Sequence, residues 1–519
     1  MKKWISDNLS QARYRKVVVG GWLLIIFFLA IFLKSGYYHD MPFLPDGDTY
    51  YPGMMAKYIV ATGQTTTNVP FEVPVTPNGA PLVFPILVTQ IHFLSNISLL
   101  AILRWFGPVI SAFISLSIFV VVRRILKSET SAMISAFLSL IVPLFSARLS
   151  STFPESIIIL FIPVVLLLLE DSARTHKYAS LLTAFLVCVS AIGYHFVSYL
   201  LWPMMFIGIF TFFVGRHWKK RNLIYIGVFI GGSLLTISLL FSNWWLFGFL
   251  QSLLKIYSKS AITGGGSLST YALPAPTVDQ WYEFLGFLPV ILATIGIGIF
   301  FFSKRYAWRI KVIIGTCFVT ILLPLQILPA LQLFSYTPWR AFVYITPFII
   351  LFSVVPLVHL PLGQRKHFSA VITAVMFLTL LYNYTAPVVA GAGEQQLTKG
   401  EYTGIAWLRD HADKDSVIVT APANGRQVVF LTNSYVAYDT GLPVFNAITS
   451  DEAVQQIALL GSFKQAFIYI SKYKLGPVYN FGWVREYANV KADLTKFEDK
   501  KNFSVVFEDA DSVIYALQK

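Results

Sequence analysis

The stretch FLPDGDTYYPGMMAKYIVATG, residues 43–63, follows shortly after the first long apolar run of the chain. It places two carboxylates, Asp46 and Asp48, one residue apart, although only 13% of the residues are charged. Charged groups close to a membrane are costly to desolvate and therefore often mark a functional site. The position of this stretch relative to the membrane thus decides how the pair is interpreted.

The composition predicts a polytopic α-helical membrane protein. The chain has 519 residues, of which 56% are hydrophobic, and a water-soluble protein of that composition would expose large apolar patches. Apolar runs of near-spanning length recur, and we predict about eleven transmembrane helices. The predicted spans are residues 17–33, 103–122, 131–147, 156–169, 179–194, 197–215, 223–243, 284–302, 312–330, 341–360 and 368–385.

Basic residues predict the orientation, because clusters of lysine and arginine mark the cytoplasmic side of a membrane. The N-terminal segment and every second loop carry them: Lys2, Lys3, Arg13, Arg15, Lys16, Arg123, Arg124, Lys127, Arg174, Lys177, Arg216, Lys219, Lys220, Arg221, Lys304, Arg305, Arg309, Lys311, Arg365 and Lys366. We therefore expect a cytoplasmic N-terminus and an extracytoplasmic C-terminal part, in a plasma membrane or its endoplasmic-reticulum equivalent. Orientation and anionic lipid account for the basic excess, so we expect no nucleic-acid partner.

The sequence divides by composition into two domains. Residues 1–394 form the predicted transmembrane domain, whereas residues 395–519 are typical of soluble protein. In the second part, TKGEYTGIAWLRDHA and DEAVQQIALLG have helical spacing, and SVIVTA, AFIYIS, FSVVFED and SVIYAL are typical of strands. We predict a small α/β domain on the outer side of the membrane.

The first outward loop is predicted to contain a helix. Asp48 or Thr49 is expected to cap it, Pro52 is suited to its first turn, and Gly63 is expected to end it. Its apolar side chains share one face, which predicts an amphipathic helix lying along the membrane surface. These side chains belong to Met54, Met55, Tyr58 and Ile59.

A second apolar segment in the same loop, residues 81–95, starts at a proline and is interrupted by Pro85 and His92. We predict that it is re-entrant or interfacial rather than a full span. Further outward loops long or polar enough to hold chemistry are residues 148–155, 244–283 and 331–340.

Three carboxylates are candidates for chemistry. Asp46 and Asp48 could hold a divalent cation, Mg²⁺ or Mn²⁺, with Glu155 as a third ligand, because carboxylate oxygens suit these ions. Alternatively, one of the pair could act as a base toward an acceptor hydroxyl. The structural alternative is that Asp-Gly-Asp is a turn followed by a helix cap. The spacing of the two aspartates leaves these alternatives open.

Basic and aromatic residues in the outward loops are candidates for substrate binding. Arg148 and Arg340 could each bind a phosphate bidentately, and Lys255 and Lys259 lie in a glycine-hinged loop that could cover such a ligand. An ion pair of one arginine with Glu155, and an aromatic belt with snorkelling lysines, are the structural alternatives. The aromatic residues predicted to bind sugar or acceptor are Tyr50, Tyr51, Tyr336 and Trp339.

These residues resemble a known family. DGDTYYPGMMAKYIVATG, residues 46–63, is similar to the first motif of the catalytic subunit of oligosaccharyltransferases. The odd number of spans, the acidic outward loops and the external α/β domain resemble the GT-C class of membrane glycosyltransferases. The resemblance implies that Asp48 is the central catalytic carboxylate, that Asp46 assists with metal or acceptor, and that Glu155 stands at the second acidic motif. It also implies that Arg340 is directed at the lipid phosphate.

The function that the resemblance implies is an inverting hexosyl- or pentosyltransferase acting on the outer face. Its donor would be a polyprenyl-phosphate or polyprenyl-diphosphate sugar, and its acceptor a glycan, a lipid or a protein. The tail lacks the Trp-Trp-Asp motif of oligosaccharyltransferases, so transfer of a lipid-linked glycan to protein is kept as the alternative. A transporter or flippase, which would favour broken spans and related halves, and a non-catalytic scaffold are the alternatives of another class.

Overall fold

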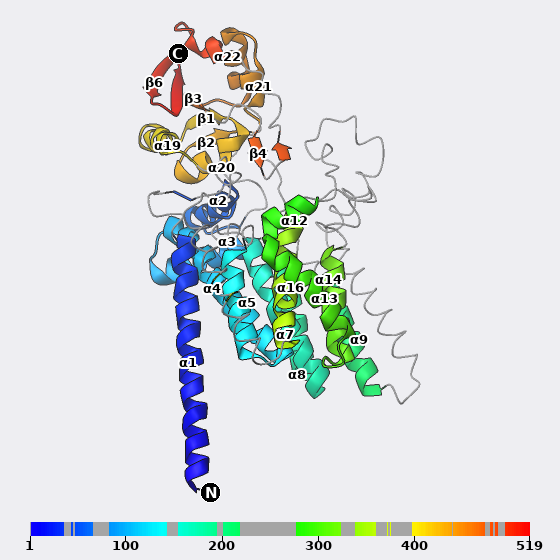
Figure 1. Ribbon diagram of the computed structural model, residues 1–519. Coiled ribbons are helices and arrows are strands. Elements are labelled where there is room, and N and C mark those ends of the chain that lie inside the picture. The colour runs from blue at the N-terminus through cyan, green and yellow to red at the C-terminus, as the bar shows by residue number, and fades with distance from the viewer. Residues whose placement is uncertain are drawn as a thin grey trace. The chain divides into compact units, whose positions relative to one another are not determined.

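The structure is a computed structural model, and contacts between its residues divide the chain into two compact units (Figure 1). The helical unit contains Met1–Lys34, Pro108–Ser150 and Glu155–Val388, and the mixed unit contains Ser35–Gly107, Ser151–Pro154 and Val389–Lys519. The structure describes residues 2–35, 43–44, 47–65, 82–142, 154–194, 201–217, 277–322, 338–359, 371, 374, 397–438, 440–472, 478–480, 483–485 and 494–518.

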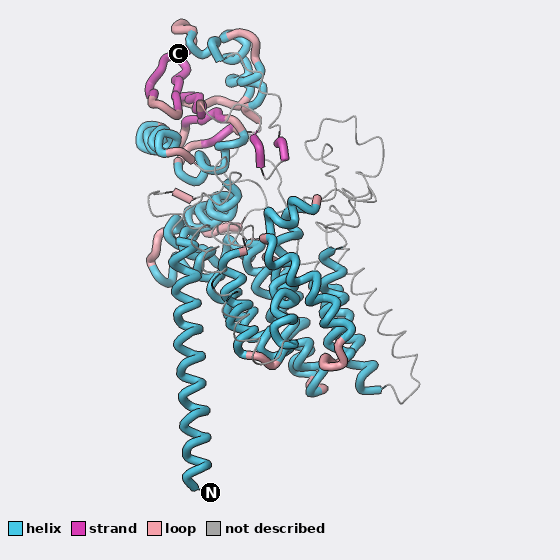
Figure 2. The backbone as a smooth tube through the Cα atoms, viewed as in Figure 1, coloured by secondary structure: helices cyan, strands magenta, loops and turns pink. Residues whose placement is uncertain are grey.

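The helical unit is built from apolar helices (Figure 2). They are α1 (Lys2–Ser35), α4 (Leu99–Leu126, mostly in this unit), α5 (Glu129–Ile141), α7 (Pro154–Thr175), α8 (Tyr178–Ile192), α9 (Leu201–His217), α12 (Val278–Leu285), α13 (Phe287–Phe302), α14 (Trp308–Leu322) and α16 (Pro338–His359).

Within the described residues, four helices are long and apolar enough to cross a membrane, or five if the bent pair α12–α13 is one span. The four are Val17–Ser35, Leu99–Leu126, Pro154–Thr175 and Phe342–His359, and they coincide with the spans predicted at 17–33, 103–122, 156–169 and 341–360. The predicted spans at 131–147, 179–194 and 197–215 contain shorter apolar helices. The predicted span 223–243 lies outside the described residues, as does 368–385 apart from Val371 and Ala374.

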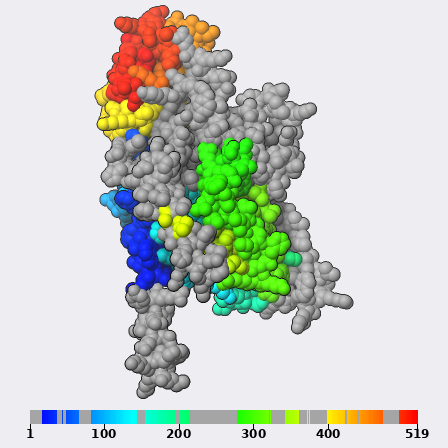
Figure 3. Space-filling model, in the orientation of Figure 1, coloured from blue at the N-terminus to red at the C-terminus, as the bar shows by residue number. Residues whose placement is uncertain are grey.

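Helices α13 and α16 pack closely because α13 presents a glycine to its neighbour. A Cβ atom on Gly296 would lie 1.9 Å from the main-chain oxygen of Phe352. Near this contact, the Ser353 hydroxyl donates a hydrogen bond of 2.8 Å to the Pro289 oxygen. Small residues and hydroxyl groups are the usual means by which spanning helices approach each other. In Figure 3 the atoms of 277–322 form a continuous surface (green) on the face shown.

A sharp bend of 108° separates α12 from α13. Gly286 stands at the bend with a φ of 86°, a value that glycine adopts without strain. Trp281 and Phe284 of α12 pack on Phe342 near the start of α16, with ring centroids 4.9 and 5.1 Å apart. These edge-to-face contacts fix the first turns of α16 against α12.

The mixed unit combines two helices of the first predicted outward loop with a sheet domain. The loop helices are α2 (Gly47–Thr62) and α3 (Val83–Ser95), followed by the first part of α4. The sheet domain contains α19 (Lys399–His411), β1 (Ser416–Thr420), α20 (Pro422–Leu431), β2 (Tyr435–Ala437), α21 (Leu442–Asn446), α22 (Ser450–Leu459), β3 (Gln465–Ser471), β4 (Val478–Asn480), β5 (Trp483–Arg485), the 3₁₀ helix η5 (Leu494–Glu498), β6 (Phe503–Glu508) and β7 (Ser512–Leu517).

The five-stranded sheet has the order β2-β1-β3-β7-β6. Strands β2, β1 and β3 are parallel, whereas β7 is antiparallel to both β3 and β6. One face packs on α21, α22 and η5 through a core that includes Val417 and Ile468, and α19 covers the other face, where Trp407 contacts Phe467. Because both faces of its central strands are buried, their sequences are continuously apolar. The sheet confirms the predicted C-terminal α/β region.

The structure corrects three local predictions between residues 47 and 95. Helix α2 begins at Gly47, so Asp48 lies within its first turn instead of capping it. Segment 83–95 is one continuous helix through Pro85 and His92, because a proline in the first turn interrupts no helical hydrogen bond. The apolar face of α2 packs on α20 and α3, so protein rather than lipid buries Met54 and Met55.

Candidate active site

For some of the predicted catalytic and phosphate-binding residues the structure describes only the main chain, and others lie outside the described residues. The main chain of Asp48 is the second residue of α2, and the main chains of Trp339 and Arg340 lie in the first turn of α16. Their side chains are outside the description. Five predicted site residues lie wholly outside the described residues: Asp46, Arg148, Lys255, Lys259 and Tyr336. The roles assigned to all of them stay predictions.

Glu155 is described in full. It is buried in the first turn of α7, with 4% of its surface exposed. The main-chain N–H groups at the start of a helix favour a negative charge there. A carboxylate in this position suits a cation or a hydrogen-bond donor as its partner.

Tyr50 is a structural residue by its contacts. Its side chain is fully buried, and its hydroxyl accepts a hydrogen bond of 3.0 Å from the Leu44 N–H. The same hydroxyl donates to the Leu44 oxygen at 3.4 Å. Burial raises the pKa of Tyr50, so the phenol stays protonated. Tyr50 thereby ties the chain before α2 to its first turn, and its predicted role in sugar binding stays a prediction.

Tyr51 is half-buried and carries a cation over its ring. The guanidinium carbon of Arg426, in α20, lies 5.5 Å from the ring centroid. Arrangements of this kind are attractive because the aromatic face is electron-rich. Tyr51 follows Asp48 by three residues, so the two positions share a face of α2.

Helix α2 lies beside α20 (Figure 1), and Lys57 joins α2 to the carboxyl end of α20. Its ammonium donates to the main-chain oxygens of Val429 and Phe430, at 3.4 and 3.0 Å, and to that of Thr432. Carbonyl groups at a helix end lack partners within the helix and attract cations. Burial lowers the pKa of Lys57 to about 8.

Gly53 completes this contact. A Cβ atom at this position would lie 2.8 Å from side-chain atoms of both Leu103 and Phe430. Phe430 also packs edge-to-face on Tyr50, with ring centroids 5.5 Å apart. The turns of α2 that follow Asp48 are therefore enclosed by α20 and the start of α4.

The sequence did not predict that Lys57, Arg426 and Phe430 lie near the candidate site. The single charge within the apolar run of α2 was the available signal for Lys57, since a lysine among Met55, Ala56 and Tyr58 needs a polar partner. No local pattern identified Phe430 or Arg426.

The predicted cation site has three carboxylates, the donor type that Mg²⁺ and Mn²⁺ prefer. Only the side chain of Glu155 is described. Elsewhere in the described part of the chain, no group of three or more His, Cys, Asp or Glu residues is placed to hold a metal. The residue types fit a cation, and the site stays a proposal.

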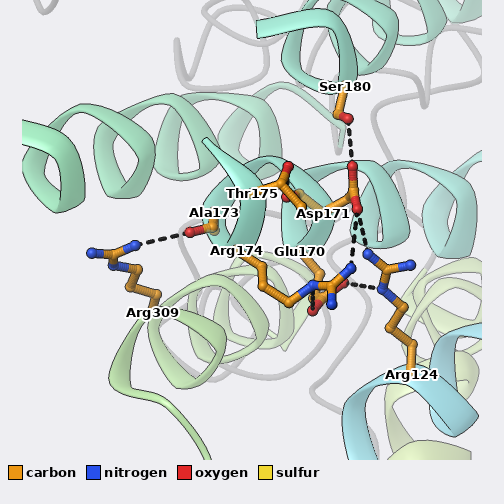
Figure 4. Close-up of polar contacts among 8 residues, drawn as sticks. All are labelled: Arg124, Glu170, Asp171, Ala173, Arg174, Thr175, Ser180 and Arg309. Atoms are coloured by element: carbon orange, nitrogen blue, oxygen red, sulfur yellow. Dashed lines mark hydrogen bonds and ion pairs between the residues drawn. The ribbon is translucent and has the colours of Figure 1, made fainter. Parts of the chain in front are cut away.

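Several of the predicted cytoplasmic basic residues are joined in a polar network (Figure 4). Arg124 donates to Glu170 at 2.5 Å and also bonds Asp171, and Asp171 accepts from the Ser180 hydroxyl at 2.6 Å. Arg309 donates to the Ala173 oxygen at 2.9 Å. The network ties the ends of α4 and α7 to the starts of α8 and α14, which is a structural role.

The fold is similar to that of several solved membrane glycosyltransferases. An oligosaccharyltransferase from Archaeoglobus fulgidus matches with a TM-score of 0.62 at 11% identity, over 87% of this chain and 69% of that chain. ArnT from Cupriavidus metallidurans, bound to undecaprenyl phosphate, matches with a TM-score of 0.55 at 12% identity, over 97% and 98%.

A third similar structure is the mycobacterial arabinofuranosyltransferase AftD, with a TM-score of 0.52 at 13% identity. The match covers 96% of this chain but only 40% of AftD. No protein-family model and no curated protein sequence matches the chain. The chain therefore has a GT-C-like fold and is an integral membrane protein, which confirms the resemblance at the level of fold.

Proposed function

We propose that this protein is an inverting glycosyltransferase that takes a sugar from a polyprenyl-phosphate or polyprenyl-diphosphate donor and transfers it to a glycan, lipid or protein on the outer face of the membrane. The observation that carries the proposal is the GT-C-like fold together with the place of Asp48 in the first turn of α2. Two further observations support details of the donor.

The first supports a monophosphate donor. The match to ArnT runs almost end to end in both chains, and that structure holds undecaprenyl phosphate. The second concerns the sugar. AftD is named an arabinofuranosyltransferase, so we propose that the transferred sugar is a pentose or a hexose. The match to an oligosaccharyltransferase supports protein as one of the acceptor classes.

The proposed chemistry is direct displacement at the anomeric carbon. The acceptor oxygen forms a bond to that carbon while the bond from carbon to phosphate oxygen breaks, and the phosphate leaves with the electron pair. Asp48 takes the proton of the acceptor hydroxyl. Arg340, Arg148, Lys255 and Lys259 would stabilise the charge that develops on the phosphate. Attack opposite the leaving group inverts the anomeric centre.

A bound Mg²⁺ or Mn²⁺ would supply a positive charge close to the leaving phosphate. Asp46, Asp48 and Glu155 are the residues proposed to hold it. We propose that four aromatic residues line the path of the sugar or acceptor: Tyr51, Trp339, Tyr336 and the more deeply buried Tyr50. The proposed orientation keeps the N-terminus cytoplasmic and the sheet domain outside.

The experiment that tests the proposal is transfer of radiolabel from a panel of polyprenyl-phosphate and polyprenyl-diphosphate sugars. Membranes would contain wild-type protein or Asp48→Asn, with and without EDTA. We expect transfer by the wild type and a loss of about 10²-fold or more in Asp48→Asn at equal protein level. Transfer retained by Asp48→Asn would contradict the role of Asp48, and transfer unaffected by EDTA would contradict the metal. Transfer from none of the donors would count against the function itself.

A further inference from the structure

We infer that helix α20 of the sheet domain positions the first turn of α2 for the reaction, and that Lys57 is the positioning residue that holds the two helices in register. The inference rests on the proposed function, because it concerns the placement of Asp48. Lys57 lies nine positions after Asp48, about 13 Å along the helix axis. It therefore acts through the helix rather than by touching a substrate.

The contacts of Lys57 indicate a fixed anchor. A surface lysine that makes no specific contact extends its ammonium into water. The ammonium of Lys57 is instead held by carbonyl groups of Val429, Phe430 and Thr432, which all belong to the carboxyl end of α20. Several acceptors of one cation fix its position better than a single ion pair, because the ammonium has three donors to distribute. Sliding or turning α2 would break these bonds together.

A second set of contacts lies between this anchor and Asp48. Phe430 fills the space left by Gly53 and packs on Tyr50. One turn earlier on α20, Arg426 covers the ring of Tyr51, three residues after Asp48. Helix α20 therefore contacts α2 from Lys57 back to Tyr50, which lies in the same first turn as Asp48. Because a shift of about 1 Å at a reacting group can cost about 10²-fold in rate, this contact can control the reaction without touching the substrate.

The test compares full-length variants purified in lipid nanodiscs. Lys57→Met removes the ammonium and keeps an unbranched apolar side chain, whereas Lys57→Arg keeps a cation with several donors. The control is Lys464→Met, which removes an exposed lysine of the sheet domain that pairs with Asp413. We expect kcat to fall about 10- to 100-fold in Lys57→Met, with the KM for the donor unchanged. We expect Lys57→Arg to restore most of the loss and Lys464→Met to behave as the wild type.

A double-mutant cycle separates positioning from general damage. Asp48→Glu keeps a carboxylate but displaces it, so the placement of α2 should matter less in that background. If Lys57 acts through Asp48, the combined variant loses less activity than the product of the single losses. Independent, multiplicative losses, or a change in donor KM alone, would overturn the inference.

Hydrogen exchange tests the positioning role of Lys57 separately from the proposed function, because the measurement does not require the protein to transfer sugar. Amides of Tyr51 and of residues 53–56 should exchange faster in Lys57→Met than in the wild type or Lys464→Met. Unchanged exchange there would overturn the positioning role even if the enzyme is active. Faster exchange in a protein that transfers no sugar from any donor would support the helix contact and refute the proposed function.

Discussion

The substitution Gly296→Ala should separate two helices of the helical unit. A Cβ atom at this position would lie 1.9 Å from the Phe352 oxygen, whereas ordinary contact begins at 3.4 Å. Helices α13 and α16 would have to part by roughly 1.5 Å, and a main-chain oxygen cannot rotate out of the way. Overpacking of this kind costs typically about 1–3 kcal/mol, and we expect the upper end of that range.

Gly298 provides a matched control on the same helix, because a Cβ atom there would meet nothing within 4 Å. Alanine is favoured over glycine inside a helix by about 1 kcal/mol, so Gly298→Ala should be neutral or stabilising. The assay is thermal unfolding of detergent-purified protein followed by tryptophan fluorescence. We expect Gly296→Ala to unfold several degrees below both the wild type and Gly298→Ala. Equal melting temperatures for the two variants would refute the close approach of α13 to α16.

Two further predictions concern charged residues. Glu170→Ala should destabilise the protein to heat by about 1–3 kcal/mol, because it removes the nearly buried carboxylate that Arg124 bonds and leaves Arg124 with Asp171 alone among the described carboxylates. By contrast Glu129→Ala, in an exposed pair with Arg123, should cost under about 1 kcal/mol. Since burial lowers the pKa of Lys57 to about 8 from its ordinary 10.5, the unfolded chain binds more protons between these values, and stability should rise with pH across this window. Thermal scans from pH 7 to 10 should show that rise in the wild type and a smaller one in Lys57→Met.

Several elements of the sheet domain could be predicted because their signals are local. Thr398 and Glu401 form a capping box at the start of α19, and this pattern is visible in four consecutive residues. Strands β1 and β3 are apolar runs of strand length, bounded by polar residues. These capping and strand patterns agree with the final fold. The elements could therefore be predicted without knowledge of contacts between residues that are distant in the sequence.

Helix α20 was not predicted because its local signals oppose a helix. Its sequence contains Asn424 and Gly425 close to its start, and both are poor helix formers. The glycine is required by a tertiary contact, since a Cβ atom there would lie 2.2 Å from the Tyr438 side chain. Packing against neighbours thus overrides local preference, and a single sequence does not show it.

The partner of α2 could not be predicted for a different reason. An apolar face on a helix looks the same whether lipid or protein covers it, so Met54 and Met55 were assigned to the membrane surface. Only the structure shows that α20 and α3 cover that face. The sequence thus predicted the candidate site from its carboxylates. The residues of α20 that pack on α2 lie far away in the chain, and the sequence did not predict them.

The bond between Lys57 and α20 has a consequence for biosynthesis. The lysine and its acceptors are 372 to 375 residues apart, and a ribosome adding about 5–20 residues per second needs roughly 20–75 s to make the segment between them. During that delay α2 packs on α3 and the start of α4 but lacks its contacts with α20, and helices of this length depend on tertiary packing for most of their stability. Helix α2 therefore gains its last contacts only after α20 of the sheet domain has been made, so a chain that stalls in between lacks the bonds that hold Lys57.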